Sequence, residues 1–227
     1  IPSSPLPAED LEVGSRGEYC AQMLAVLGNS RLFEDRHHPD GGQAESTLFK
    51  YEVEKWISEI ARPIEIDAEQ FHGPMVSALR FRQPGGEWVR ATNMGYGVSY
   101  ALPIVVGGLS ALKGGMVLVE NPEAHLHPAG QSRIGVFLAW LSAQGVQVVV
   151  ETHSDHVLNG IRLAIAKFKY VRSSDAIIHY FDEGELVGPF VKSMRISETG
   201  GVSNWPAGFF DQYQMDVASL GRIRRQG

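Results

Sequence analysis

The sequence has little cysteine, no long hydrophobic run and no excess of positive charge. Cys20 is the only cysteine among 227 residues, which excludes an internal disulfide and a zinc site built from several cysteines. No apolar run approaches the roughly 20 residues that cross a bilayer. We therefore expect no membrane segment and a cytoplasmic location. The formal net charge of -6 excludes a generally basic protein that coats nucleic acid, but not a local basic patch.

The composition is that of a folded protein with a core. Hydrophobic residues make up 44% of the chain and charged residues 20%, which argues against a disordered tail. The first residue is Ile1, and residues 1–14 are rich in Pro, Ser and Glu. We expect a linker there, in a chain cut from a longer protein.

The order of predicted elements indicates an α/β fold. Helical periodicity predicts helices over residues 17–28, 47–61, 99–112, 129–144 and 155–168. Short apolar or alternating segments predict strands over residues 64–67, 77–82, 87–92, 116–120, 146–150 and 176–181. The last three strands alternate with helices, so we expect one parallel sheet flanked by helices.

Two of these strands end in an acid that is followed by a histidine-containing loop. The first loop has the sequence ENPEAHLHP (residues 120–128), and the second has the sequence ETHSDH (residues 151–156). Because ligands bind at the carboxyl ends of parallel strands, both loops should lie on one rim. A carboxylate there suits Mg²⁺ beside transferring phosphates. The alternative is that Glu120 caps a following helix.

A glycine-rich segment, NMGYGVSY (residues 93–100), precedes the helix that leads into the first of these strands. Backbone N–H groups at a helix N-terminus, together with the hydroxyl of Ser99, suit a phosphate. The alternative is a glycine-rich turn in which Ser99 is the N-cap.

Together, in this order, these segments resemble the C-terminal half of an ABC-type ATPase. The chain resembles, over roughly residues 14–220, the ABC ATPases of the RecF/SMC-like and OLD (overcoming lysogenization defect) class. ENPEAHLHP is similar to the acidic hallmark of that class, and VVVETHSDHVLNGIR to its switch-histidine segment. The ending GVSNWPAGFFD resembles that of a prokaryotic branch with a C-terminal domain of uncharacterised function.

The resemblance implies a dimer-facing surface. Gly95, Gly97 and Ser99 would form the signature loop, which binds the γ-phosphate of an ATP held by the partner subunit. His125 and His127 would occupy the D-loop, which crosses the interface between two ATPase heads.

The resemblance also implies the residues of the hydrolytic site. Glu120 would be the Walker B acid that holds Mg²⁺ through water, and His153 the switch histidine that contacts the γ-phosphate. Asn121 stands where the class has a catalytic Glu, and an amide cannot act as a general base. We therefore expect ATP binding with modest turnover, in which Asn121 positions water or Glu123 assists.

One expected element is missing. No Gly-x-x-x-x-Gly-Lys-Ser/Thr phosphate loop occurs in the sequence. The implied fold is the C-terminal lobe of a P-loop NTPase without its P-loop segment. We expect a linker and helical subdomain over residues 1–62, the ATPase lobe over residues 63–198 and a C-terminal segment over residues 199–227.

The function expected from the resemblance is a homodimeric, ATP-driven switch. It would use ATP and Mg²⁺ to control an effector, such as a nuclease subunit, or a DNA contact in DNA repair or anti-phage defence. One alternative is a module that binds ATP without useful hydrolysis. Another is a metal-dependent hydrolase, whose potential ligands would be His125, His127, Glu151, His153, Asp155 and His156.

Overall fold

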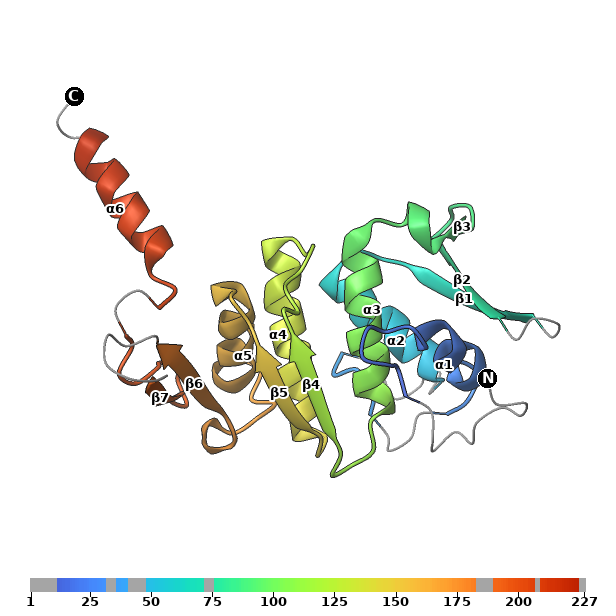
Figure 1. Cartoon of the computed structure of the whole chain (residues 1–227), viewed down its shortest axis with the longest axis horizontal. Coiled ribbons are helices and arrows are strands. Elements are labelled where there is room, and N and C mark those ends of the chain that lie inside the picture. Colours follow the sequence, from blue (N-terminus) through green and yellow to red (C-terminus); the bar gives the residue numbers. More distant parts are fainter. Residues whose placement is uncertain are drawn as a thin grey trace. The chain divides into compact units, whose positions relative to one another are not determined.

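The computed structural model describes residues 12–31, 36–40, 48–71, 76–182, 190–206 and 209–224 (Figure 1). Most of the expected N-terminal linker lies outside these ranges. The chain forms two compact units, Ile1–Ile161 and Arg162–Gly227. No helix in the described ranges is both long and apolar enough to cross a membrane. The functional division at residues 62 and 198 remains a proposal.

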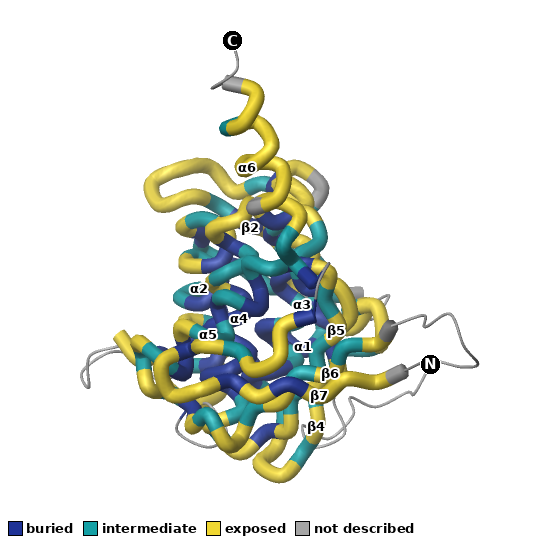
Figure 2. Tube along the Cα trace, turned by 90° about the vertical axis from the view of Figure 1, so that its left-hand side faces the viewer, coloured by how far each residue is buried: buried dark blue, intermediate teal, exposed yellow. Residues whose placement is uncertain are grey.

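Four helices build the core of the first unit. They are α1 (Cys20–Leu27), α2 (Phe49–Ile60), α3 (Tyr96–Ser110) and α4 (Pro128–Ala143). All four lie within two or three residues of the predicted bounds. Figure 2 shows the buried positions gathered along these helices.

Helix α2 buries the face that its periodicity predicts. Val53, Trp56, Ile57 and Ile60 are all buried, because positions three and four apart share one side of a helix. The Trp56 ring lies 5.0 Å from the ring of Phe137 and 4.9 Å from that of Trp140. These aromatic contacts join α2 to α4.

Helix α3 begins earlier than predicted, which changes the role of one residue. Gly95, with a φ of 89°, is the N-cap of α3, so Ser99 is an exposed residue inside the helix rather than its N-cap. A positive φ is readily adopted by glycine, and the chain therefore turns into the helix at Gly95.

The predicted hairpin forms a small antiparallel sheet in the first unit. Strand β1 (Glu65–Phe71) pairs with β2 (Val76–Arg82), which pairs with β3 (Val89–Arg90). The register places Ile66 opposite Phe81, and both side chains are buried. The opposite face is charged, as alternation along a strand requires.

The two strands that carry the acid-ended loops form a parallel pair. Strand β4 (Met116–Glu120) pairs with β5 (Gln147–Glu151), and α4 packs against β5. Helix α5 (Asp155–Ala166) follows β5 and crosses the boundary between the units. The structure thus confirms the α/β class, with a parallel strand pair and flanking helices.

The third strand expected in this sheet pairs elsewhere. Strand β6 (Ile177–Asp182) forms a separate antiparallel pair with β7 (Phe190–Arg195) in the second unit. The prediction of a single three-stranded parallel sheet is therefore wrong for β6. An apolar strand pattern does not specify its partner, and β7 follows closely in the sequence, so a short connection closes the pair.

The second unit has its own aromatic cluster. The Phe209 ring lies 5.2 Å from the ring of Tyr180, 5.0 Å from that of Trp205 and 4.4 Å from that of Phe210. These contacts indicate a packing role for the described aromatic residues of the WPAGFFD segment, of which residues 207–208 lie outside the described ranges. Helix α6 (Gln212–Arg224) follows the cluster.

Candidate functional site

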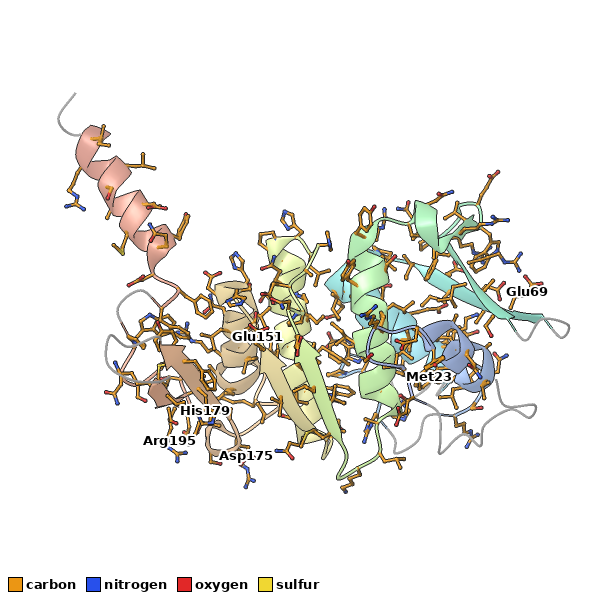
Figure 3. All side chains as sticks on the ribbon, viewed as in Figure 1. Met23, Glu69, Glu151, Asp175, His179 and Arg195 are labelled. Atoms are coloured by element: carbon orange, nitrogen blue, oxygen red, sulfur yellow. The ribbon has the colours of Figure 1, made fainter. Side chains whose placement is uncertain are left out.

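Two carboxylates lie side by side where the parallel strands end. Glu120 is the register partner of Glu151, and both residues are exposed. Figure 3 shows Glu151 at the end of β5. The Asn121 N–H donates to the Glu151 backbone oxygen at 3.0 Å, which extends the strand pairing into the first loop. The prediction that both loops share one rim is confirmed.

The loop after β4 is held in two successive tight turns. Asn121 and His125 have φ values of 47° and 60°, in the left-handed region. The Ala124 N–H donates to the Asn121 backbone oxygen, and the Leu126 N–H donates to the Glu123 backbone oxygen, both at 3.0 Å. Asn and His adopt this conformation more readily than branched residues do, so the residue types at both positions suit the turns.

Glu123 ties this loop to the loop that follows β5. Its Oε2 accepts a hydrogen bond from Thr152 Oγ1 at 2.6 Å, and its Oε1 accepts one from the His153 N–H at 2.8 Å. Both carboxylate oxygens are engaged. The arrangement favours a positioning role for Glu123 over the assisting role in hydrolysis that the sequence suggested.

Ser154 fixes the start of α5 beside this contact. Its hydroxyl oxygen accepts hydrogen bonds from the N–H groups of His156 at 3.1 Å and Val157 at 3.3 Å, and the hydroxyl donates to Gln131 Oε1 at 2.6 Å. This is N-cap chemistry, which satisfies the free amides of the first helical turn. The cap holds the His153 segment against α4.

His153 itself points into solvent. Its side chain is 83% exposed, and Nε2 lies 3.0 Å from Glu151 Oε1. The ring is therefore available to a ligand that approaches the strand ends.

The glycine-rich loop and the loop after β4 meet in a pocket of about 350 Å³. The residues that line it come from the end of α2, from the start of α3 and from the turn into α4. They are Glu59, Ile60, Ala61, Arg62, Met94, Gly95, Tyr96, Gly97, Val98, His125, Leu126, His127, Ala129 and Gly130. Four predicted residues, Gly95, Gly97, His125 and His127, thus share one cavity.

Both glycines lie where the walls of the pocket come close, and Gly95 also has a positive φ of 89°. A Cβ at Gly97 would lie 3.1 Å from the His125 backbone oxygen, and one at Gly95 would lie 3.2 Å from Arg62 Nη2. Ser99 does not line the pocket and is exposed on α3. Backbone N–H groups of the first turn of α3 lack helical acceptors, and they give this end of the helix a partial positive charge.

The sequence did not predict several contributors to this site. Tyr96 and Tyr100 flank the His125 ring, with centroids at 5.3 Å and 4.5 Å, and both tyrosines are exposed. Arg62 reaches the pocket from the end of α2. Their only sequence signal was proximity to the glycine-rich segment or to a helix end. His127 also caps α4, since its Nδ1 accepts from the Ala129 N–H at 3.4 Å.

The histidine-rich set proposed for a metal-dependent hydrolase does not come together. His153 pairs with Glu151, and His156 Nε2 lies 3.8 Å from Asp155 Oδ1. Among the described residues, these six potential ligands form no group of three close enough to share an ion. They lie at several strand and helix ends, so the structure does not support the metal-dependent hydrolase alternative.

Three of the solved structures with weak similarity to this chain come from work on SMC proteins. One comes from work on ATP-driven dimerization and DNA-stimulated activation of SMC ATPases: it is 13% identical, with 77% of this chain and 90% of that chain covered and a TM-score of 0.46. A Pyrococcus furiosus Smc head bound to the C-terminal domain of ScpA is 11% identical and has a TM-score of 0.47. The match covers 77% of this chain and 37% of that chain. An Smc head bound to the C-winged helix domain of ScpA is 15% identical and has a TM-score of 0.47. The match covers 64% of this chain and 42% of that chain.

These TM-scores lie below 0.5, so the family assignment rests on sequence models. A search of curated proteins finds no match. A model described as "Protein of unknown function (DUF3696)" matches residues 171–220. A model described as "AAA domain, putative AbiEii toxin, Type IV TA system" matches residues 25–159, more than half of the chain. The chain belongs to this AAA domain family.

Proposed function

We propose that this chain is part of an ATP-dependent, dimeric switch that controls an effector. The observation that carries the proposal is the shared pocket of the glycine-rich loop and the 125–127 loop. These loops are distant in sequence, and the resemblance assigns both to the surface where two ATPase heads meet. In this proposal, Gly95, Gly97 and Ser99 face the γ-phosphate of an ATP held by the partner, and His125 and His127 lie at the head interface.

The end of the pocket at the start of α3 suits an anion, although Glu59 also lines the pocket. The N-terminal turn of α3 presents backbone N–H groups, and the Arg62 guanidinium lies beside Gly95. Tyr96 and Tyr100 add exposed aromatic surface at its edge. A phosphate with an adjoining flat ring fits this combination, as in a nucleotide.

The strand ends fit a magnesium ion in this proposal. Glu120 and Glu151 are adjacent and exposed, and carboxylate oxygens are ligands that Mg²⁺ prefers. Glu120 would hold the ion through water, and Mg²⁺ would neutralise charge on the phosphates. His153, aligned by Glu123 and Ser154, would contact the γ-phosphate.

Turnover is expected to be slow because Asn121 cannot accept a proton. Asn121 therefore also supports a second candidate function, an ATP-gated binding module without useful hydrolysis. Measuring ATP affinity and hydrolysis rate on one preparation distinguishes the switch from the binding module. Both require a phosphate loop in the same protein, since residues 1–227 contain none.

The decisive experiment measures ATP-dependent dimerisation of the full-length protein by sedimentation velocity. Ser99→Glu places a negative charge on an exposed position of α3, one residue after Val98, which lines the pocket, and we expect it to weaken the dimer by at least about tenfold. Ser15→Glu, at another exposed serine, is the matched control and should not affect dimerisation. ATP-dependent dimerisation that survives Ser99→Glu unchanged would refute the proposal.

The wider role follows from the resemblance and the family description. We place the switch in DNA repair or anti-phage defence, in the OLD-like class, with a nuclease subunit or a DNA contact as the controlled effector. The family description names a toxin of a TA system, which is consistent with such control. Loss of effector activity in cells that carry His153→Ala would support this placement, and full activity would contradict it.

A further inference from the structure

A second group of potential ligands lies where the loop 36–40 meets the end of α2. One ring nitrogen of His38 and one carboxylate oxygen each from Asp40 and Glu59 all lie within 4.8 Å of one another. Within the described ranges, no other three His, Cys, Asp or Glu side chains come together in this way. The ligands of a single bound ion must approach one another to this degree.

The His38 side chain is buried and aimed into this group. It is 6% exposed, and its ring lies 4.3 Å from the ring of Trp56. Nε2 is buried and forms no hydrogen bond with any described residue. It lies 3.0 Å from Glu59 Oε1, outside hydrogen-bonding geometry. A buried polar atom without a hydrogen bond costs free energy, so such an atom points to a ligand.

The loop is built to hold this orientation. The His38 N–H donates to Oε2 of Glu52 at 2.8 Å, and Glu52 is itself buried on α2. The Asp40 N–H donates to His38 Nδ1 at 3.2 Å. The first bond holds the backbone of His38, and the second fixes the orientation of its ring in this structure.

The charge balance of the site favours a cation. Asp40 and Glu59 bring two carboxylates close to the His38 ring, and Glu52 brings a third to the His38 backbone. Basic side chains also face these carboxylates: His37 Nδ1 is 3.6 Å and Lys55 Nζ 3.8 Å from Glu52 Oε1, and Arg133 Nη1 is 3.9 Å from Glu59 Oε2.

We propose that His38, Asp40 and Glu59 bind a divalent transition-metal ion. One imidazole nitrogen with two carboxylates suits Zn²⁺ or Mn²⁺ better than Mg²⁺, which prefers oxygen ligands alone. Binding through Nε2 places the ring proton on Nδ1 and replaces the hydrogen bond from the Asp40 N–H. The backbone at Asp40 therefore adjusts when the metal binds.

The ion would join the loop 36–40 to the last turn of α2. Glu59 also lines the 350 Å³ pocket, and Arg62 follows three residues later. A metal at this point would hold the end of α2 in place beside the glycine-rich loop. The site is separate from the proposed Mg²⁺ position at the strand ends, and it does not depend on the proposed ATP function.

The test uses the full-length protein after chelation and desalting. Zn²⁺ binding is measured by calorimetry, and Co²⁺ binding by its visible absorption. We expect one equivalent of Zn²⁺ per chain and a higher melting temperature with Zn²⁺. Asp40→Asn and Glu59→Gln should weaken binding by at least about tenfold. We do not replace His38 itself, because His38→Asn would disturb the packing of the buried imidazole against Trp56.

Two controls separate this site from other histidines and acids. His37→Asn changes the neighbouring histidine, and Glu151→Gln changes the carboxylate beside His153; both should bind Zn²⁺ as the wild type does. The proposal is overturned if the wild type binds less than one equivalent. It is also overturned if Asp40→Asn and Glu59→Gln bind Zn²⁺ normally, or if His37→Asn or Glu151→Gln weakens binding equally.

Discussion

The Glu123 carboxylate accepts a hydrogen bond from the Thr152 hydroxyl at 2.6 Å and so joins the loops that follow β4 and β5. Its second oxygen receives the His153 N–H at 2.8 Å. A ligand that moves one loop therefore moves the other. This link is a physical basis for the proposed switch, in which His153 would report the state of the 120–128 segment.

Replacing Glu123 with Gln should loosen the His153 segment. The amide retains one acceptor oxygen in place of two, so one of the two hydrogen bonds is lost, which costs about 1–3 kcal/mol for a charged acceptor. We expect amide hydrogen exchange at His153 to become about tenfold faster. We expect ATP turnover to become about tenfold slower. Glu87→Gln, at an exposed position, is the control. Abolished turnover with unchanged exchange would instead identify Glu123 as a base.

Replacing Asn121 with Asp should raise ATP turnover. Asp also adopts the left-handed backbone conformation, so the turn is retained while a proton acceptor is gained. General-base catalysis contributes about 10²–10⁴-fold, and we expect an increase of at least about tenfold in phosphate release at saturating ATP. Asn204→Asp, at another left-handed position, should have no effect. Unchanged turnover in Asn121→Asp would show that this position does not limit hydrolysis.

Replacing Gly135 with Ala should destabilise the protein. The added Cβ would overlap the Val157 backbone oxygen, and the close crossing of α4 and α5 leaves no room for it. We expect a loss of about 1–3 kcal/mol in the free energy of unfolding. That corresponds to a melting temperature lower by roughly 2–4 °C per kcal/mol. Nothing lies within 4 Å of a Cβ at Gly221, so Gly221→Ala should not destabilise. Equal melting temperatures for both variants would contradict the close crossing.

Replacing Glu54 with Gln should change how stability depends on pH. Burial raises the pKa of Glu54, although the Ile66 N–H that donates to its Oε1 at 2.6 Å acts in the opposite direction. A carboxyl with a raised folded pKa binds more protons when folded, so its contribution is fully present below the unfolded pKa and is lost as pH rises through the folded pKa.

Gln keeps an acceptor for Ile66 without a charge. We therefore expect Glu54→Gln to gain stability relative to the wild type as pH rises above about 4, measured by urea unfolding at a series of pH values. Glu12→Gln, at an exposed position, is the control: its free energy of unfolding should differ from that of the wild type by the same amount at every pH. A variant that loses stability relative to the wild type as pH rises would contradict the raised pKa.

The helices of the first unit were predictable because their signals are local. The spacing of Val53, Trp56, Ile57 and Ile60 defines a buried face wherever α2 packs. The partner of β6 was not predictable in the same way, since a strand pattern specifies one exposed and one buried face but not a neighbour. The N-cap of α3 was misplaced because both Gly95 and Ser99 have cap chemistry, and the positive φ of Gly95 decided between them.

The sequence alone determined the α/β class, the order of the loops and the residue types at the strand ends. It did so because periodicity, turn residues and terminal acids are properties of consecutive residues. Only the tertiary structure decided that Glu123 holds Thr152 and that Gly97 faces His125. It also brought His38 to Glu59, two residues separated by most of α2. Contacts between distant residues depend on how the helices and strands pack, and no local pattern encodes that packing.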